Sequence, residues 1–241
     1  MVLLWNSDSL ARRSSVASLS LVLLPRCDSD CLSSHKSHSE GEDRLDTVGT
    51  MGIGARLRRS WGEFVGPEAT PANHLITAAT TVSGGVLAPL IARRRGAGVG
   101  NATATSLLAV DLVGGVYVNN TRACARWYER PGQGDAAHLS FAAIHLHPAA
   151  VAWLDRGTPR RVVGPVWAAS HYGYMVAATA LIRNFPAQRR PLGVALTVVG
   201  LALDRVLGPS DQAPWFAWAY YPKLLLGHAA ASMWSDQELK P

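Results

Sequence analysis

The stretch NATATSLLAVDLVGGVYV occupies residues 101–118 and contains one charged side chain, Asp111, near its middle. At about 1.5 Å of helical rise per residue, the stretch approaches the length that crosses a bilayer's hydrocarbon core of about 30 Å. An ionised carboxylate at that depth costs several kcal/mol unless it is paired, hydrated or protonated. The stretch therefore predicts a membrane-spanning helix with a polar site inside the bilayer.

Five other apolar segments of similar length share this pattern, and arginine-rich loops separate them. They cover residues 74–92, 136–154, 162–182, 192–207 and 215–234. The segments are too long for strands and lack a regular alternation of apolar and polar residues. Buried helices of a soluble protein do not account for six such segments bounded by arginine. We therefore predict an all-α fold, a polytopic transmembrane helix bundle of about six spans.

The composition agrees with a membrane protein. Only 17% of the residues are charged, against about 25% in a typical soluble domain, and 48% are hydrophobic. The net charge is +6, and the arginines gather between the apolar segments. This arrangement suits contact with lipid headgroups, so we expect the lipid bilayer as a partner. The sequence has no arginine–aromatic face and no known nucleic-acid-binding motif, so we expect no nucleic-acid partner.

The basic residues also predict an orientation in the cell membrane. With the N-terminus inside, ten basic residues flank the spans on the cytoplasmic side and seven on the other side. The positive-inside rule favours this orientation, although the excess is smaller than multi-pass proteins usually show. The sequence leaves the oligomeric state open.

By composition the chain divides into four parts. Residues 1–50 are polar and have no helical or strand period, so we interpret them as disordered or as a mis-called start, dispensable for folding. Residues 51–72 form a basic amphipathic lead-in, residues 73–235 the six-span domain, and residues 236–241 a C-terminal tail.

Cysteine usage points to neither a disulfide framework nor a zinc finger. The three cysteines are Cys27, Cys31 and Cys124. The run Cys27-x3-Cys31-x3-His35-x2-His38 lacks the longer stretch that separates the cysteine and histidine pairs of a finger. We interpret the run as part of the N-terminal extension.

Histidines in the later apolar segments supply partners for Asp111. If these segments form continuous helices, His145 and His171 lie at nearly the same depth in the bilayer as Asp111, whereas His228 lies off-centre. Each lies on a small-residue or mixed face, the side expected to face the bundle. We expect Asp111, His145 and His171 to converge with His228 as the catalytic residues.

Two further predictions concern the neighbours of these residues. His138 shares the face of His145, while His147 points nearly opposite, so the candidate metal ligands are Asp111, His138, His145, His171 and His228. Lys223 lies away from the His228 face and either snorkels to the interface or pairs with an acid.

Several chemistries fit a carboxylate among imidazoles. Zinc or iron takes such ligands, and a metal with an open position activates water, so we favour a membrane-embedded enzyme acting on an apolar or lipidic substrate. A proton-coupled small-molecule transporter uses the same residue types as a proton relay. Haem between paired histidines is a third arrangement. In a non-catalytic structural protein, the same groups only link helices by hydrogen bonds.

One string supports the importance of these residues. Asp111 begins an Asp-x-x-Gly-Gly element, and His138 to Pro148 read His-x-x-Phe-x-x-x-His-x-His-Pro. The string resembles a family of small multi-spanning bacterial integral membrane proteins that has no established activity. The resemblance covers residues 111–148 and implies a membrane protein in which Asp111, His138, His145 and His147 matter.

The residue types are also similar to those of the alkaline ceramidase-like hydrolases, which bind zinc through membrane aspartate and histidine. Their paired terminal His-x-x-x-His is missing here because His228 stands alone. The likeness therefore extends to residue types and no further.

Overall fold

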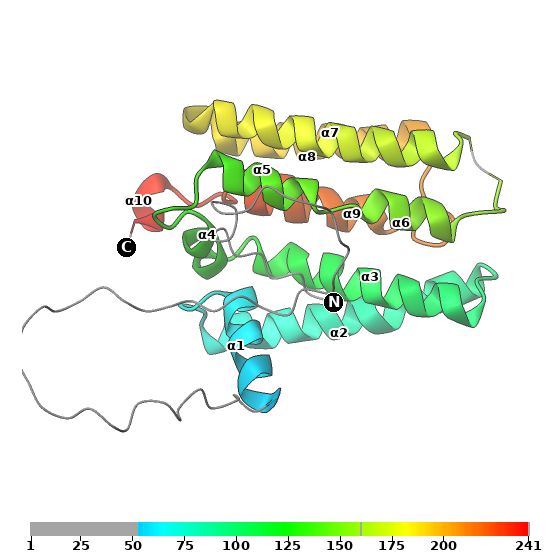
Figure 1. Cartoon of the computed structure of the whole chain (residues 1–241), viewed down its shortest axis with the longest axis horizontal. Coiled ribbons are helices and arrows are strands. Elements are labelled where there is room, and N and C mark those ends of the chain that lie inside the picture. Colours follow the sequence, from blue (N-terminus) through cyan, green and yellow to red (C-terminus); the bar gives the residue numbers. More distant parts are fainter. Residues whose placement is uncertain (1–52, 160, 241) are drawn as a thin grey trace, which may run out of the picture.

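The computed structural model describes residues 53–159 and 161–240, and Figure 1 shows their arrangement. Helices account for 76% of these residues, and the described part contains no strand, so the all-α prediction is confirmed. The predictions for residues 1–50, including the cysteine and histidine run, lie outside the described residues.

The chain forms long helices joined by short connections. In order, the elements are α1 (Ile53–Val65), α2 (Pro71–Arg94), α3 (Val99–Val118), α4 (Arg122–Tyr128), α5 (Asp135–Ala143), α6 (His147–Leu154), α7 (Gly164–Asn184), the short 3₁₀ turn η2 (Pro186–Gln188), α8 (Arg189–Leu207), α9 (Phe216–Tyr221), the π-helical segment η3 (Pro222–Ala229) and α10 (Asp236–Leu239). In Figure 1 the pair α2 and α3 lies on one side and the pair α7 and α8 on the other. The broken segments α5–α6 and α9–η3 lie between them.

Helices α2 and α3 form a closely packed hairpin. A capping box between Thr70 and Asn73 begins α2, and Pro71 occupies its first turn. Gly84 permits the close approach, since a Cβ there would lie 2.8 Å from the Cβ of Val113 on α3. Among the described residues, these two helices are long and apolar enough to cross a membrane.

The segment 136–154 is two helices rather than the one that its composition predicts. Helix α5 ends at Ala143, and α6 begins at His147. Pro148 explains the break, because it has no N–H to donate and its ring would clash with the carbonyl of Ile144 in a continuous helix. The prediction that His147 points away from the face of His145 depended on that continuous helix, and it is wrong.

The segment 215–234 is also interrupted. Helix α9 passes at Pro222 into the π-helical segment η3, which ends before Ala231 and Ser232 in left-handed backbone conformations, φ 54° and 56°. Single π-helical turns are often found at functional sites. With this geometry both Lys223 and His228 are buried, whereas a regular helix would place them on different faces.

The uninterrupted helices α7 and α8 each present one side to the core. Their buried residues include Trp167, His171, Met175 and Ala178 on α7, and Gly193, Thr197, Gly200 and Asp204 on α8. The burial of His171 agrees with its predicted position on a face toward the bundle. The predicted C-terminal tail contains α10, which a capping box between Ser235 and Glu238 begins.

Candidate functional site

Asp111 forms an ion pair with Lys223 inside the bundle. Lys223 Nζ on η3 donates to Asp111 Oδ2 on α3 at 2.6 Å and lies 3.3 Å from the Asp111 carbonyl oxygen. The lysine side chain is 3% exposed and the aspartate side chain 18%. Of the two outcomes expected for Lys223, snorkelling or pairing with an acid, the structure shows pairing with an acid.

Gly115 makes room for this pair. It lies one helical turn after Asp111, and a Cβ at Gly115 would come within 2.5 Å of Lys223 Cε. The aliphatic part of the Lys223 side chain therefore crosses the α3 backbone at Gly115, where there is no side chain, to reach the Asp111 carboxylate. The small-residue face of α3 accommodates a charged partner, in addition to a neighbouring backbone.

His147 shares the same carboxylate oxygen with Lys223. Its Nε2 lies 3.0 Å from Asp111 Oδ2, and an ionised carboxylate only accepts hydrogen bonds, so Nε2 carries the hydrogen. Nδ1 of the neutral imidazole is then an acceptor. Nδ1 of His147 is buried and has no hydrogen-bond partner among the described residues.

His145 lies beside His147, with ring centroids 5.3 Å apart. Its Nδ1 lies 2.6 Å from the carbonyl oxygen of Phe141, so Nδ1 is the donor and Nε2 the acceptor of the neutral ring. The Tyr220 hydroxyl donates to the His145 carbonyl oxygen at 3.2 Å. These bonds satisfy the backbone where α5 ends.

One donor atom from each of Asp111, His145 and His147 lies within 4.8 Å of the others, which is close enough for one metal ion. The same carboxylate already has an ammonium counterion at 2.6 Å. A divalent cation bound to that oxygen would lie next to Lys223 and be repelled by it. The donor set as arranged therefore fits an ion pair flanked by imidazoles better than a metal centre.

His138 and His228 form a second group with aromatic neighbours. The His228 ring stacks on Phe141 at 3.9 Å between centroids and meets the edge of Tyr128 at 4.4 Å. The His138 ring lies 4.6 Å from His228. The two histidines are 1% and 3% exposed, and none of their four ring nitrogens has a hydrogen-bond partner among the described residues.

His171 belongs to a third group. Its Nδ1 lies 2.7 Å from the Tyr221 hydroxyl, and its Nε2 lies 3.6 Å from a carboxylate oxygen of Asp204. The sequence places His171 at the depth of Asp111, but the structure places it beside the α8 carboxylate. Asp111 and His145 come together as expected, while His171 lies in this separate group.

The sequence does not place His147 and Lys223 with Asp111, although the resemblance implies that His147 matters and Lys223 is expected to pair with an acid or to snorkel. The signal for His147 is Pro148, which ends the helical period that turns His147 away. The signal for Lys223 is its position after Pro222 in an apolar segment, where a cation needs a buried acid.

The single described cysteine takes no part in this chemistry. Burial raises the pKa of the Cys124 thiol to about 12, since the apolar surroundings disfavour a thiolate. Cys124 on α4 is fully buried. At neutral pH it is a protonated thiol and therefore neither a nucleophile nor a ready metal ligand.

Comparison of the chain with protein-family models, with curated proteins and with solved structures finds no match.

Proposed function

We propose that this chain is a multi-pass membrane protein with six helical spans, in which α5–α6 and α9–η3 are broken spans. Most exposed positions along α7 and α8 are apolar, among them Val166, Leu181, Val194, Val198 and Val199. Apart from the pairs of Asp111 and Asp204 inside the bundle, ion pairs lie near its ends, such as Arg95–Asp211 at one end and Arg183–Glu129 at the other. An apolar belt between charged ends suits a bilayer.

The interrupted helices fit this proposal. Non-helical backbone at membrane depth is tolerated where it is buried in protein or lines a cavity. Membrane transporters place their substrate and ion sites at such breaks. Here the break between α5 and α6 lies beside His145 and His147, and the π-helical segment carries Lys223.

The proposed activity is proton-coupled transport of a small molecule, with Asp111, Lys223 and His147 as the proton relay. One observation carries it: a single oxygen, Asp111 Oδ2, is shared by the ammonium of Lys223 and the imidazole of His147. Imidazole carries a proton on either ring nitrogen and is a common proton shuttle. His147 therefore places a proton carrier directly beside the Asp111–Lys223 pair.

In this proposal, protonation of His147 leads to a movement of η3. A proton that reaches His147 Nδ1 gives an imidazolium, and Asp111 then faces two cations. One carboxylate cannot neutralise two cations, so the attraction between Asp111 and Lys223 weakens. Lys223 lies on η3, whose π-helical turns are less stable than α-helix. Release of the lysine is therefore the step that would let η3 move and expose a solute site.

The test is proton entry into vesicles reconstituted with the full chain. The vesicles contain a pH-sensitive dye, and a potassium gradient with valinomycin drives protons inward, with and without a pool of amino acids, sugars and organic ions. Wild-type protein is expected to admit protons faster than protein-free vesicles. Asp111→Asn is expected to reduce the rate to that of protein-free vesicles, because the amide no longer balances Lys223 or holds His147.

Asp211→Asn is the matched control, since Asp211 pairs with Arg95 at the bundle end. This variant is expected to keep the wild-type rate. An Asp111→Asn protein that admits protons as fast as wild type would contradict the proposal. Stoichiometric zinc or iron in the purified wild type, lost in Asp111→Asn, would also contradict it and favour the metal-dependent membrane enzyme.

A further inference from the structure

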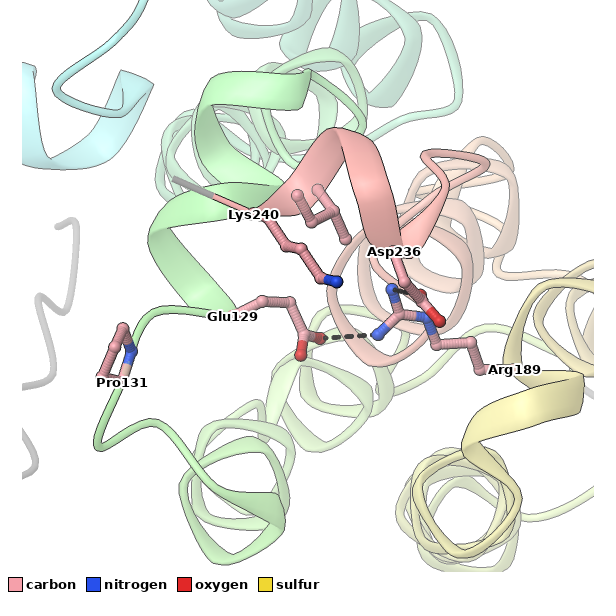
Figure 2. Close-up of a pocket in the computed structure, with 6 residues that line it drawn as sticks. Glu129, Pro131, Arg189, Asp236 and Lys240 are labelled. Carbon is pink, nitrogen blue, oxygen red and sulfur yellow. Dashed lines mark hydrogen bonds and ion pairs between the residues drawn. The ribbon is translucent and has the colours of Figure 1, made fainter.

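A pocket opens at the end of the bundle where α4 and α10 lie. Its volume is about 330 Å³, and its lining residues are Glu129, Pro131, Arg189, Asp236, Leu239 and Lys240. Figure 2 shows the Glu129 carboxylate directed toward the Arg189 guanidinium, and the two groups are 3.5 Å apart. A volume of this size holds several water molecules at about 30 Å³ each. The pocket therefore brings water to Glu129.

Glu129 also reaches the buried histidine pair. Its Oε1 lies 3.7 Å from His138 Nε2, too far for a direct hydrogen bond. His138 in turn lies against His228. A buried polar group without a partner destabilises a fold, so two histidines with four such nitrogens need an explanation other than stability.

Further contacts connect His138 and His228 with the proposed relay at Asp111. His228 and His145 pack against the same ring, that of Phe141, at 3.9 Å and 4.4 Å between centroids. His145 neighbours His147, which contacts Asp111. Four imidazoles thus lie in succession between the pocket and the Asp111–Lys223 pair.

The geometry points to a proton path that enters at the Glu129 pocket and runs through His138, His228, His145 and His147 to Asp111. The inference rests on the proposed function and deepens it by naming the entrance of the relay. His138, His228 and His147 can each accept a proton on one ring nitrogen and release one from the other. His145 donates from Nδ1 to the Phe141 carbonyl oxygen, so it accepts and releases the proton through Nε2. Transfer between His228 and His145, which pack against the same Phe141 ring, requires rotation of the rings so that their nitrogens approach each other.

The charges around the path oppose a divalent metal ion more strongly than a proton. Arg183 donates to Glu129 at 2.7 Å, and Arg189 lies 3.5 Å from the same carboxylate. Tyr128 faces His228, and Lys223 pairs with Asp111 at the inner end. Two guanidinium groups beside Glu129 would repel a divalent cation at the His138–His228 pair, whereas a proton is carried on one imidazole at a time.

The test compares His138→Phe and His228→Phe with wild type in the vesicle assay. Phenylalanine keeps a flat ring against Phe141 but carries no proton, so each variant is expected to lower proton entry toward the Asp111→Asn rate. Neither variant is expected to melt at a lower temperature than wild type, because the substitution removes unpaired buried nitrogens. The two variants interrupt different steps, so one of them suffices if the other folds poorly.

His74→Phe is the control, since His74 on α2 accepts a hydrogen bond from Trp61 and lies off the path. It is expected to keep the wild-type rate. If Asp111→Asn stops proton entry while His138→Phe and His228→Phe admit protons as wild type does, the path is refuted and the proposed function stands. If wild type admits protons no faster than protein-free vesicles, the proposed function fails and the path with it.

Discussion

Lys223→Met is expected to lower the free energy of unfolding by about 3–5 kcal/mol, the usual cost of removing one partner from a buried ion pair. The lysine side chain is 3% exposed, and its ammonium is 2.6 Å from Asp111. Methionine fills the same space beside Gly115 but leaves the Asp111 carboxylate without its countercharge. Unfolding of the detergent-solubilised protein with a denaturant, followed by circular dichroism, measures the change.

Two further variants isolate the charge effect. Arg95→Met removes a cation from the Arg95–Asp211 pair, whose side chains are 45% and 41% exposed, and such exposed pairs contribute at most about 1 kcal/mol. The double variant Asp111→Asn/Lys223→Met removes both buried charges and is expected to recover most of the loss. A Lys223→Met protein no less stable than Arg95→Met would show that the buried pair does not stabilise the fold.

Gly200→Ala is expected to destabilise the protein by about 1–3 kcal/mol, as overpacking of a core does. A Cβ at Gly200 on α8 would lie 2.8 Å from three atoms of the Tyr221 ring. The ring cannot easily move away, because its hydroxyl is 2.7 Å from His171 Nδ1. The substitution therefore forces α8 away from α9.

Gly173→Ala is the matched control. Gly173 lies inside α7, and a Cβ there would meet no atom within 4 Å. Alanine is the better helix former by about 1 kcal/mol, so this variant is expected to be as stable as wild type or more stable. Thermal unfolding of both variants in one detergent makes the comparison. Equal melting temperatures for the two would mean that α8 and α9 do not pack as closely as described.

The sequence predicts the all-α fold class, and it predicts the burial of His171 because α7 is continuous. A regular α-helix turns by 100° per residue, so spacing alone places His171 on the side that faces the bundle. The same rule fails where a proline interrupts the helix. Pro148 brings His147 to Asp111, and the π-helical turns after Pro222 bury Lys223 and His228 together.

The partner of Asp111 could not be chosen from the sequence. An acid in an apolar segment predicts a buried partner, and Lys223 is predicted to need either an acid or an interface. Which helices are neighbours is a property of the folded bundle, and helix spacing along the chain does not contain it. The depth of His171 suggests a contact with Asp111, yet α7 packs this histidine against Tyr221 and Asp204.

The buried Asp111–Lys223 ion pair can be tested in lipid bilayers by a solid-state NMR distance between Lys223 Nζ and the Asp111 carboxyl carbon. The chain is labelled with ¹⁵N at the lysine side chains and ¹³C at the aspartate carboxyls, and the Lys223 signal is identified by its loss in Lys223→Met. We expect strong dipolar coupling, as required by an Nζ–Oδ2 separation of 2.6 Å, and its loss in Asp111→Asn. A Lys223 nitrogen without coupling to any aspartate carboxyl, in protein that has inserted into the bilayer, would show that the buried Asp111–Lys223 pair does not form.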